Sequence, residues 1–150
     1  MQLDDSLKAG YLQDGYLVLP SFFSAAEIAP LCSETERLIE AARGKAESDA
    51  VHDLEALHQS NGDPRVRRIK DPVQQFDVYR EFSRNEKLLS VVRALIGDNV
   101  RFHNSKINIK AAGIGAAVEW HQDWAFYPHT NDAVLAVGIA LQDLTEDNGP

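Results

Sequence analysis

The expected fold is decided by one stretch of this 150-residue chain, Val100-Arg101-Phe102-His103-Asn104-Ser105-Lys106-Ile107-Asn108-Ile109-Lys110. Apolar and polar side chains alternate along it, and a period of two is typical of a β-strand with one buried face. Residues 118–123 and 133–142 predict two further strands. Short antiparallel strands joined by loops, with helices outside them, indicate a mainly β fold of the double-stranded β-helix (jelly-roll) type. We therefore expect residues 98–150 to supply the first core strands of a jelly roll.

The chain supplies only part of such a fold. A complete jelly roll has about eight core strands, and residues 98–150 provide roughly half of these before the sequence reaches Asn148-Gly149-Pro150. We therefore expect a single domain over residues 1–150, the N-terminal portion of a jelly roll that is incomplete at its C-terminus. Unpaired strand edges would then favour aggregation or an edge-strand dimer.

The first 97 residues have a mainly helical pattern with short strands. Ser24, followed three residues later by Glu27, predicts a capping box at the start of a helix. The polar segment 45–63 predicts an excursion or mobile lid, in which His52 and His58 are expected to be solvated. The other expected elements are helices over 3–13, 76–82 and 87–96, a buried strand over 16–20 and a strand over 66–69.

Composition narrows the possible partners and the cellular compartment. A net charge of −8 and a pI near 5.0 argue against nucleic acid or an anionic membrane surface as a partner. The single cysteine, Cys32, excludes an internal disulfide and fits a reducing compartment. No apolar run approaches membrane-spanning length, and the first residues are acidic rather than signal-like. These features predict a cytoplasmic protein whose partner is a small molecule.

The segment Trp120-His121-Gln122-Asp123 contains two candidate metal ligands. Side chains at positions i and i+2 of an extended strand point the same way, so His121 and Asp123 can converge on one metal ion. Two histidines and one carboxylate leave coordination positions open and suit ferrous iron. Such a pair also arises by chance, and its third ligand is not obvious. The aromatic residues that follow predict a ligand-binding mouth: Trp124, Phe126 and Tyr127.

Several further segments fall in a recognisable order. They are Asp14-Gly15-Tyr16-Leu17-Val18-Leu19-Pro20, Leu95-Ile96-Gly97-Asp98-Asn99-Val100, residues 105–110, Ile139-Ala140-Leu141-Gln142-Asp143 and Asn148-Gly149. Each segment alone is weak evidence for any family. Together with the Trp120-His121-Gln122-Asp123 segment, the set resembles the N-terminal half of the phytanoyl-CoA dioxygenase family of iron- and 2-oxoglutarate-dependent oxygenases.

The resemblance implies a role for particular residues. His121 and Asp123 would be the first two ligands of Fe(II), and Arg68 and Lys106 would meet the carboxylate of 2-oxoglutarate. Both cations could equally be exposed strand residues. The substrate mouth would be bordered by Trp124, Phe126, Tyr127, Asn108 and His103. The implied reaction uses dioxygen to hydroxylate a small organic metabolite, while 2-oxoglutarate is decarboxylated to succinate.

The third iron ligand of the family is a histidine far downstream, followed by an arginine or similar group that clamps 2-oxoglutarate. Neither is present in these 150 residues. The histidine nearest to that role, His129, lies in a loop, whereas the family's ligand comes from another strand. Activity of this chain alone is therefore doubtful.

Two other classes of protein remain open. The chain could be a non-catalytic binding or assembly module that keeps half of an oxygenase fold, although such a module has no reason to retain both ligands. A cupin-like metal protein would predict a His-x-His pair, which the sequence lacks.

Overall fold

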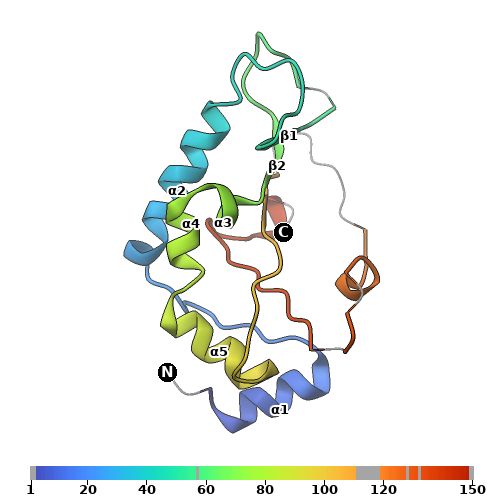
Figure 1. Cartoon of the computed structure of the whole chain (residues 1–150). Helices are drawn as coiled ribbons and strands as arrows, with labels where there is room; N and C mark the ends of the chain where they lie inside the picture. The colour runs from blue at the N-terminus through green and yellow to red at the C-terminus, as the bar shows by residue number, and fades with distance from the viewer. Residues whose placement is uncertain (1–2, 57, 111–118, 128, 132, 149–150) are drawn as a thin grey trace.

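The structure, a computed structural model, describes residues 3–56, 58–110, 119–127, 129–131 and 133–148. In chain order its elements are α1 (Asp5–Asp14), α2 (Ala25–Glu40), β1 (His52–Leu54), β2 (Val66–Lys70), α3 (Pro72–Gln75), α4 (Asp77–Phe82), α5 (Glu86–Ile96), β3 (Lys106–Asn108) and the 3-10 turns η1 (Asp123–Ala125) and η2 (Glu146–Asn148). Helices α2 and α4 pack together beside the strands, while α1 and α5 pack together at the end of the molecule near the N-terminus (Figure 1).

Local sequence signals set the ends of the helices. The hydroxyl of Ser24 accepts the N–H of Glu27, and the Glu27 carboxylate accepts the N–H of Ser24 at 2.8 Å, which completes the predicted capping box of α2. Helix α1 ends at Gly15, whose φ of 79° is readily adopted by glycine. Helix α5 begins after Asn85, whose side chain accepts the N–H groups of Lys87 and Leu88.

The strands form one antiparallel sheet in the order β1-β2-β3. Ile69 on β2 lies opposite Ile107 on β3, and both belong to the apolar core or pack against it. Arg68 lies opposite Asn108, and Lys70 lies opposite Lys106. Because alternate residues of a strand point to opposite faces, one face of the sheet is apolar and the other is polar and cationic.

The core lies between α2, β2 and α4. Leu31 and Leu38 of α2 pack with Ile69 of β2, and Tyr79 of α4 closes the cluster. The hydroxyl of Tyr79 lies 2.8 Å from that of Thr35, which itself donates to the Leu31 carbonyl. The polar groups of this buried contact are therefore satisfied, as a well-packed core requires.

The segment 45–63 is tied to the rest of the fold. It contains β1, which the sequence did not predict, and His52 is only 3% exposed rather than solvated. His58 is also structural: its Nε2 lies 2.9 Å from the Lys45 carbonyl, and its Nδ1 accepts the N–H of Arg65. The prediction of solvated histidines was wrong because the ring nitrogens satisfy backbone groups that loops leave unpaired.

Most of the predicted core strands do not form in the described residues. Of the strand expected over 100–110, only Lys106–Asn108 is a strand, and residues 133–142 have no strand assignment. Residues 119–122 are not a strand, and Asp123 begins η1 instead; Val118 lies outside the described residues. Strands need a hydrogen-bonded neighbour, and residues 106–108 have one in β2. The family expectation of a jelly roll is therefore not seen in this part of the chain.

The expected buried strand over 16–20 was also wrong. Tyr16 and Val18 are 67% and 68% exposed, and the segment runs as irregular chain between α1 and α2 (Figure 1).

Cys32 is half-buried, as a packing residue would be, and its thiol donates to the Leu141 carbonyl at 3.2 Å. Among the described residues, no helix is both long and apolar enough to cross a membrane.

Candidate metal centre

The side chains of His121 and Asp123 converge. The Nε2 atom of His121 lies 3.2 Å from Oδ1 of Asp123, and both side chains are about one-third exposed (35% and 36%). The backbone achieves this differently from the predicted strand, because Asp123 is the first residue of η1 while residues 121 and 122 precede that turn. The pair is therefore open to a ligand from solvent.

Neighbouring groups orient the His121 ring. Its Nδ1 lies 2.7 Å from the carbonyl oxygen of Glu119. A carbonyl only accepts, so Nδ1 carries a hydrogen, and the other ring nitrogen, Nε2, faces Asp123. The ring of Phe126 packs edge-on against the imidazole at a centroid distance of 5.6 Å. A backbone hydrogen bond on the second nitrogen is the usual way in which a metal-binding histidine is oriented.

The spacing of the two donor atoms fits a metal ion. Ligand atoms about 2.1 Å from a metal and at right angles to each other lie about 3.0 Å apart, which is close to the 3.2 Å that separates Nε2 of His121 from Oδ1 of Asp123. Within the described residues, no group of three or more histidine, cysteine, aspartate or glutamate side chains comes together. His129 thus does not complete the set.

The predicted aromatic residues lie close to this pair. Trp124, in η1, donates its indole N–H to the Asn131 carbonyl at 3.2 Å. The ring of Phe126 packs on His121, although 65% of this residue is exposed to solvent. Tyr127 packs edge-on against His103. The structure thus brings together the five residues between 121 and 127 that were expected at the metal site or the substrate mouth, in addition to His103 from a distant segment.

The other predicted residues lie on the polar face of the sheet. Arg68 and Asn108 are cross-strand neighbours, as are Lys70 and Lys106. An oxygen of Asp53 lies 4.0 Å from the Arg68 guanidinium, and Nε of Arg68 is buried without a partner. None of the described residues forms an ion pair with Lys70 or Lys106. This cationic face includes Lys70, which was not among the residues expected at the site although it lies two residues from Arg68 on the same strand.

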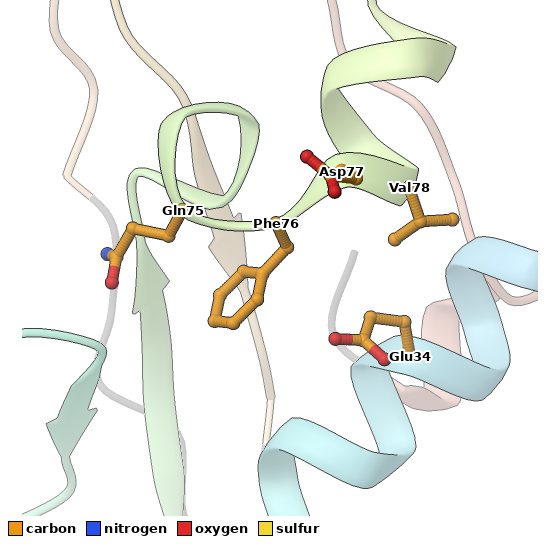
Figure 2. Close-up of a pocket in the computed structure, with 5 residues that line it drawn as sticks. All are labelled: Glu34, Gln75, Phe76, Asp77 and Val78. Atoms are coloured by element: carbon orange, nitrogen blue, oxygen red, sulfur yellow. The ribbon is translucent and has the colours of Figure 1, made fainter.

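Among the described residues, no hydrogen bond, ion pair or ring contact joins the cationic face to the His121 and Asp123 pair. The two are connected along the chain through residues 111–118, which lie outside the described residues. A separate open hollow of about 350 Å³ contains no predicted site residue (Figure 2). Its lining comes from α2, the end of α3 and the start of α4: Glu34, Gln75, Phe76, Asp77 and Val78.

His121 and Asp123, which converge beside the ring of Phe126, are a candidate pair of metal ligands. Residues 11–150 match the Phytanoyl-CoA dioxygenase (PhyH) family, and the chain belongs to that family.

Similar proteins carry related names. The chain is 42% identical over 141 residues to a probable alpha-ketoglutarate-dependent hypophosphite dioxygenase of Stutzerimonas stutzeri, covering 93% of this chain and 48% of that protein. It is 30% identical over 152 residues to an L-proline trans-4-hydroxylase of Streptomyces griseoviridis, covering 95% and 51%. An ectoine dioxygenase of Stutzerimonas stutzeri strain A1501 is 28% identical over 151 residues, covering 92% and 45%. The chain thus spans about half the length of these relatives.

Proposed function

We propose that the protein is an Fe(II)- and 2-oxoglutarate-dependent dioxygenase that oxidises a small molecule. The observation that carries this proposal is the approach of His121 Nε2 to Asp123 Oδ1, with Nδ1 of the same ring held by a backbone carbonyl. His121 and Asp123 would hold the iron. The resemblance to the family implies that the complete protein uses a further histidine as the third ligand. The family also implies a jelly-roll fold for that protein.

When bound in such a site, ferrous iron supplies the activation of dioxygen. One oxygen atom enters succinate as 2-oxoglutarate loses carbon dioxide, and the other converts a substrate X–H bond to X–OH. The residues of this chain orient the metal ligands and receive the two organic molecules. The aromatic residues around Phe126 would limit the access of water to the reacting atoms.

We propose that the cationic face of the sheet binds a carboxylate of 2-oxoglutarate. Like charges placed directly opposite one another destabilise a sheet, and Lys70 faces Lys106 across β2 and β3. A bound anion would relieve this repulsion. Arg68 has a buried Nε without a partner and only a 4.0 Å contact to Asp53, so its guanidinium can receive a carboxylate.

Hypophosphite is the first substrate that we would test, because the relative named for it shares 42% identity with this chain. Its oxidation would replace one P–H bond by P–OH and give phosphite. L-Proline and ectoine are the next candidates, since relatives at 30% and 28% identity are named for them.

The experiment is a turnover assay of the protein as its gene encodes it, supplied with Fe(II), 2-oxoglutarate and each candidate substrate in air. We expect succinate to form in step with the oxidised product. His121→Ala should abolish both, whereas Gln122→Ala, which changes the exposed residue between the two ligands, should retain them. Equal succinate formation by the wild type and His121→Ala would refute the assignment of His121 as an iron ligand.

The alternative is a non-catalytic binding or assembly module. It predicts that the complete protein forms no succinate with any substrate and binds Fe(II) no better than His121→Ala does. Anaerobic titration with Fe(II), followed by the absorption band of the iron complex with 2-oxoglutarate, distinguishes the two functions without requiring the correct substrate.

A further inference from the structure

Three side chains from two segments form a ring cluster beside the candidate metal pair. The ring centroid of His103 lies 5.1 Å from that of Tyr127 and 5.2 Å from that of His129, both in edge-to-face arrangement. Residues 101–105 bring one histidine, and the loop after η1 brings the other two rings. We call His103, Tyr127 and His129 the histidine–tyrosine cluster.

Hydrogen bonding fixes which atom His129 can offer to a ligand. Its Nδ1 donates to the backbone carbonyl of Tyr127. The remaining nitrogen, Nε2, therefore faces away from its own backbone. His129 and His103 are both exposed, while Tyr127 is half-buried. The rings of the cluster thus pack against one another, while the side chains of His103 and His129 are open to solvent.

The cluster is adjacent to the proposed iron site. Phe126 packs on the His121 ring at 5.6 Å, and the next residue, Tyr127, packs on His103. A small molecule held at His103 and His129 would therefore lie next to the proposed metal ligands. It would occupy a position distinct from the cationic face of the sheet, which we assign to 2-oxoglutarate.

We propose that the histidine–tyrosine cluster binds an oxyanion group of the substrate and thereby selects small anionic substrates. This inference rests on the proposed dioxygenase function, because it assigns the cluster to the substrate of that reaction. Imidazole N–H and phenol O–H groups are donors that match oxyanion oxygens. Because Nδ1 of His129 already donates to the Tyr127 carbonyl, its Nε2 donates to an anion only when the ring is doubly protonated.

A second metal ion is a poorer occupant. A tightly bound transition metal needs at least three strong donors, and the described residues place no third histidine, cysteine or carboxylate with this histidine pair. Among these residues, no carboxylate is paired with His103, Tyr127 or His129 that would compete with an anion. The donor set is thus suited to an oxyanion rather than to a cation.

The test is anaerobic calorimetric titration of the whole protein with hypophosphite. His103→Phe and His129→Phe keep a ring in each position, so the packing is retained while the donors are lost. We expect each to weaken binding by roughly tenfold or more, as loss of a hydrogen bond to a charged group does. Thr130→Ala, beside the cluster, should bind within about twofold of the wild type, since no donor of the cluster is altered.

Two results would overturn the inference: a wild type that gives no binding heat up to millimolar hypophosphite, or Phe variants that bind as the wild type does. Succinate formation from 2-oxoglutarate is measured separately. Hypophosphite binding that depends on both histidines, in a protein that forms no succinate, would refute the dioxygenase proposal and support the anion site.

Discussion

His52 on β1 ties the sheet to the end of α2, since its Nε2 lies 2.8 Å from the carbonyl oxygen of Leu38. The last carbonyls of a helix lack intrahelical partners, and Leu38 is in the last turn of α2. On the other side of the ring, Nδ1 lies 3.1 Å from Oδ1 of Asp49. Both ring nitrogens thus face acceptors, in a side chain that is almost fully buried.

Replacing His52 by Ala should destabilise the protein by about 2–4 kcal/mol, because it leaves the Leu38 carbonyl unpaired and opens a cavity. His52→Gln keeps an amide donor and should lose less. The measurement is the midpoint of urea unfolding, with Gln59→Ala, an exposed change, as the control. A His52→Ala midpoint equal to that of the control would show that this contact does not stabilise the fold.

Asp49 predicts a pH dependence of stability. Burial alone would raise the pKa of Asp49, but the hydrogen bonds from Lys45 and from the N–H groups of His52 and Val51 outweigh burial and hold the pKa well below its usual range. A carboxyl with a depressed folded-state pKa stabilises the fold above its unfolded pKa of about 3.9. That contribution is lost as the pH falls from there toward the folded pKa.

The stability of Asp49→Asn should therefore lie below that of the wild type at pH 7, and the two should converge as the pH falls below about 4. Urea unfolding followed between neutral and acidic pH measures both curves. Asp98→Asn, which alters an exposed carboxyl near Gly97, is the matched control and should follow the wild type throughout. Parallel curves for Asp49→Asn and the wild type would exclude this role.

The helices could be predicted from the sequence because their signals are local. Ser24 with Glu27 marked the start of α2, and the helices expected over 3–13 and 87–96 correspond to α1 and α5, each followed by a glycine. These signals depend on hydrogen bonds within a few residues. The part of the fold that such signals govern was therefore correctly predicted.

The strands could be predicted less well because they depend on distant partners. The alternation over 100–110 is real, but only residues 106–108 meet β2. Tyr16 and Val18 have strand-forming side chains and lie exposed, with no strand paired to them in the described part of the chain. His52 was misjudged for the same reason, since nothing in a polar segment indicates that Leu38 lies beside it.

The candidate site could be predicted in part. The convergence of His121 and Asp123 was expected from their spacing and is seen, although their binding of iron stays a prediction. Arg68 and Asn108 were selected separately, and the register places them opposite each other. Lys70 and His129 were assigned to their sites only from the sheet register and the ring contacts. Neither contact can be inferred from the sequence.

Tyr79 offers a test of the buried hydrogen bonds in the core. Tyr79→Phe removes the hydroxyl that lies 2.8 Å from that of Thr35. Thr35 still donates to the Leu31 carbonyl, so we expect a loss of only about 1 kcal/mol in the free energy of unfolding. Tyr16→Phe, which alters an exposed hydroxyl, should be neutral. Equal unfolding midpoints for both variants would mean that water replaces the Tyr79 hydroxyl without cost.

Arg68 and Arg84 allow a matched test of the cationic face. Arg68 lies on β2 opposite Asn108, whereas Arg84 is an exposed arginine between α4 and α5, outside the sheet. Arg68→Gln should therefore weaken 2-oxoglutarate binding while Arg84→Gln should not. We expect the KM for 2-oxoglutarate to rise roughly tenfold to a hundredfold in Arg68→Gln, since an ionic hydrogen bond is lost. The affinity for Fe(II) should stay unchanged in both variants, because neither residue is a proposed ligand. Equal changes in KM for the two variants would refute the assignment of 2-oxoglutarate to this face, while a loss of Fe(II) binding in Arg68→Gln would mean that the arginine supports the fold instead.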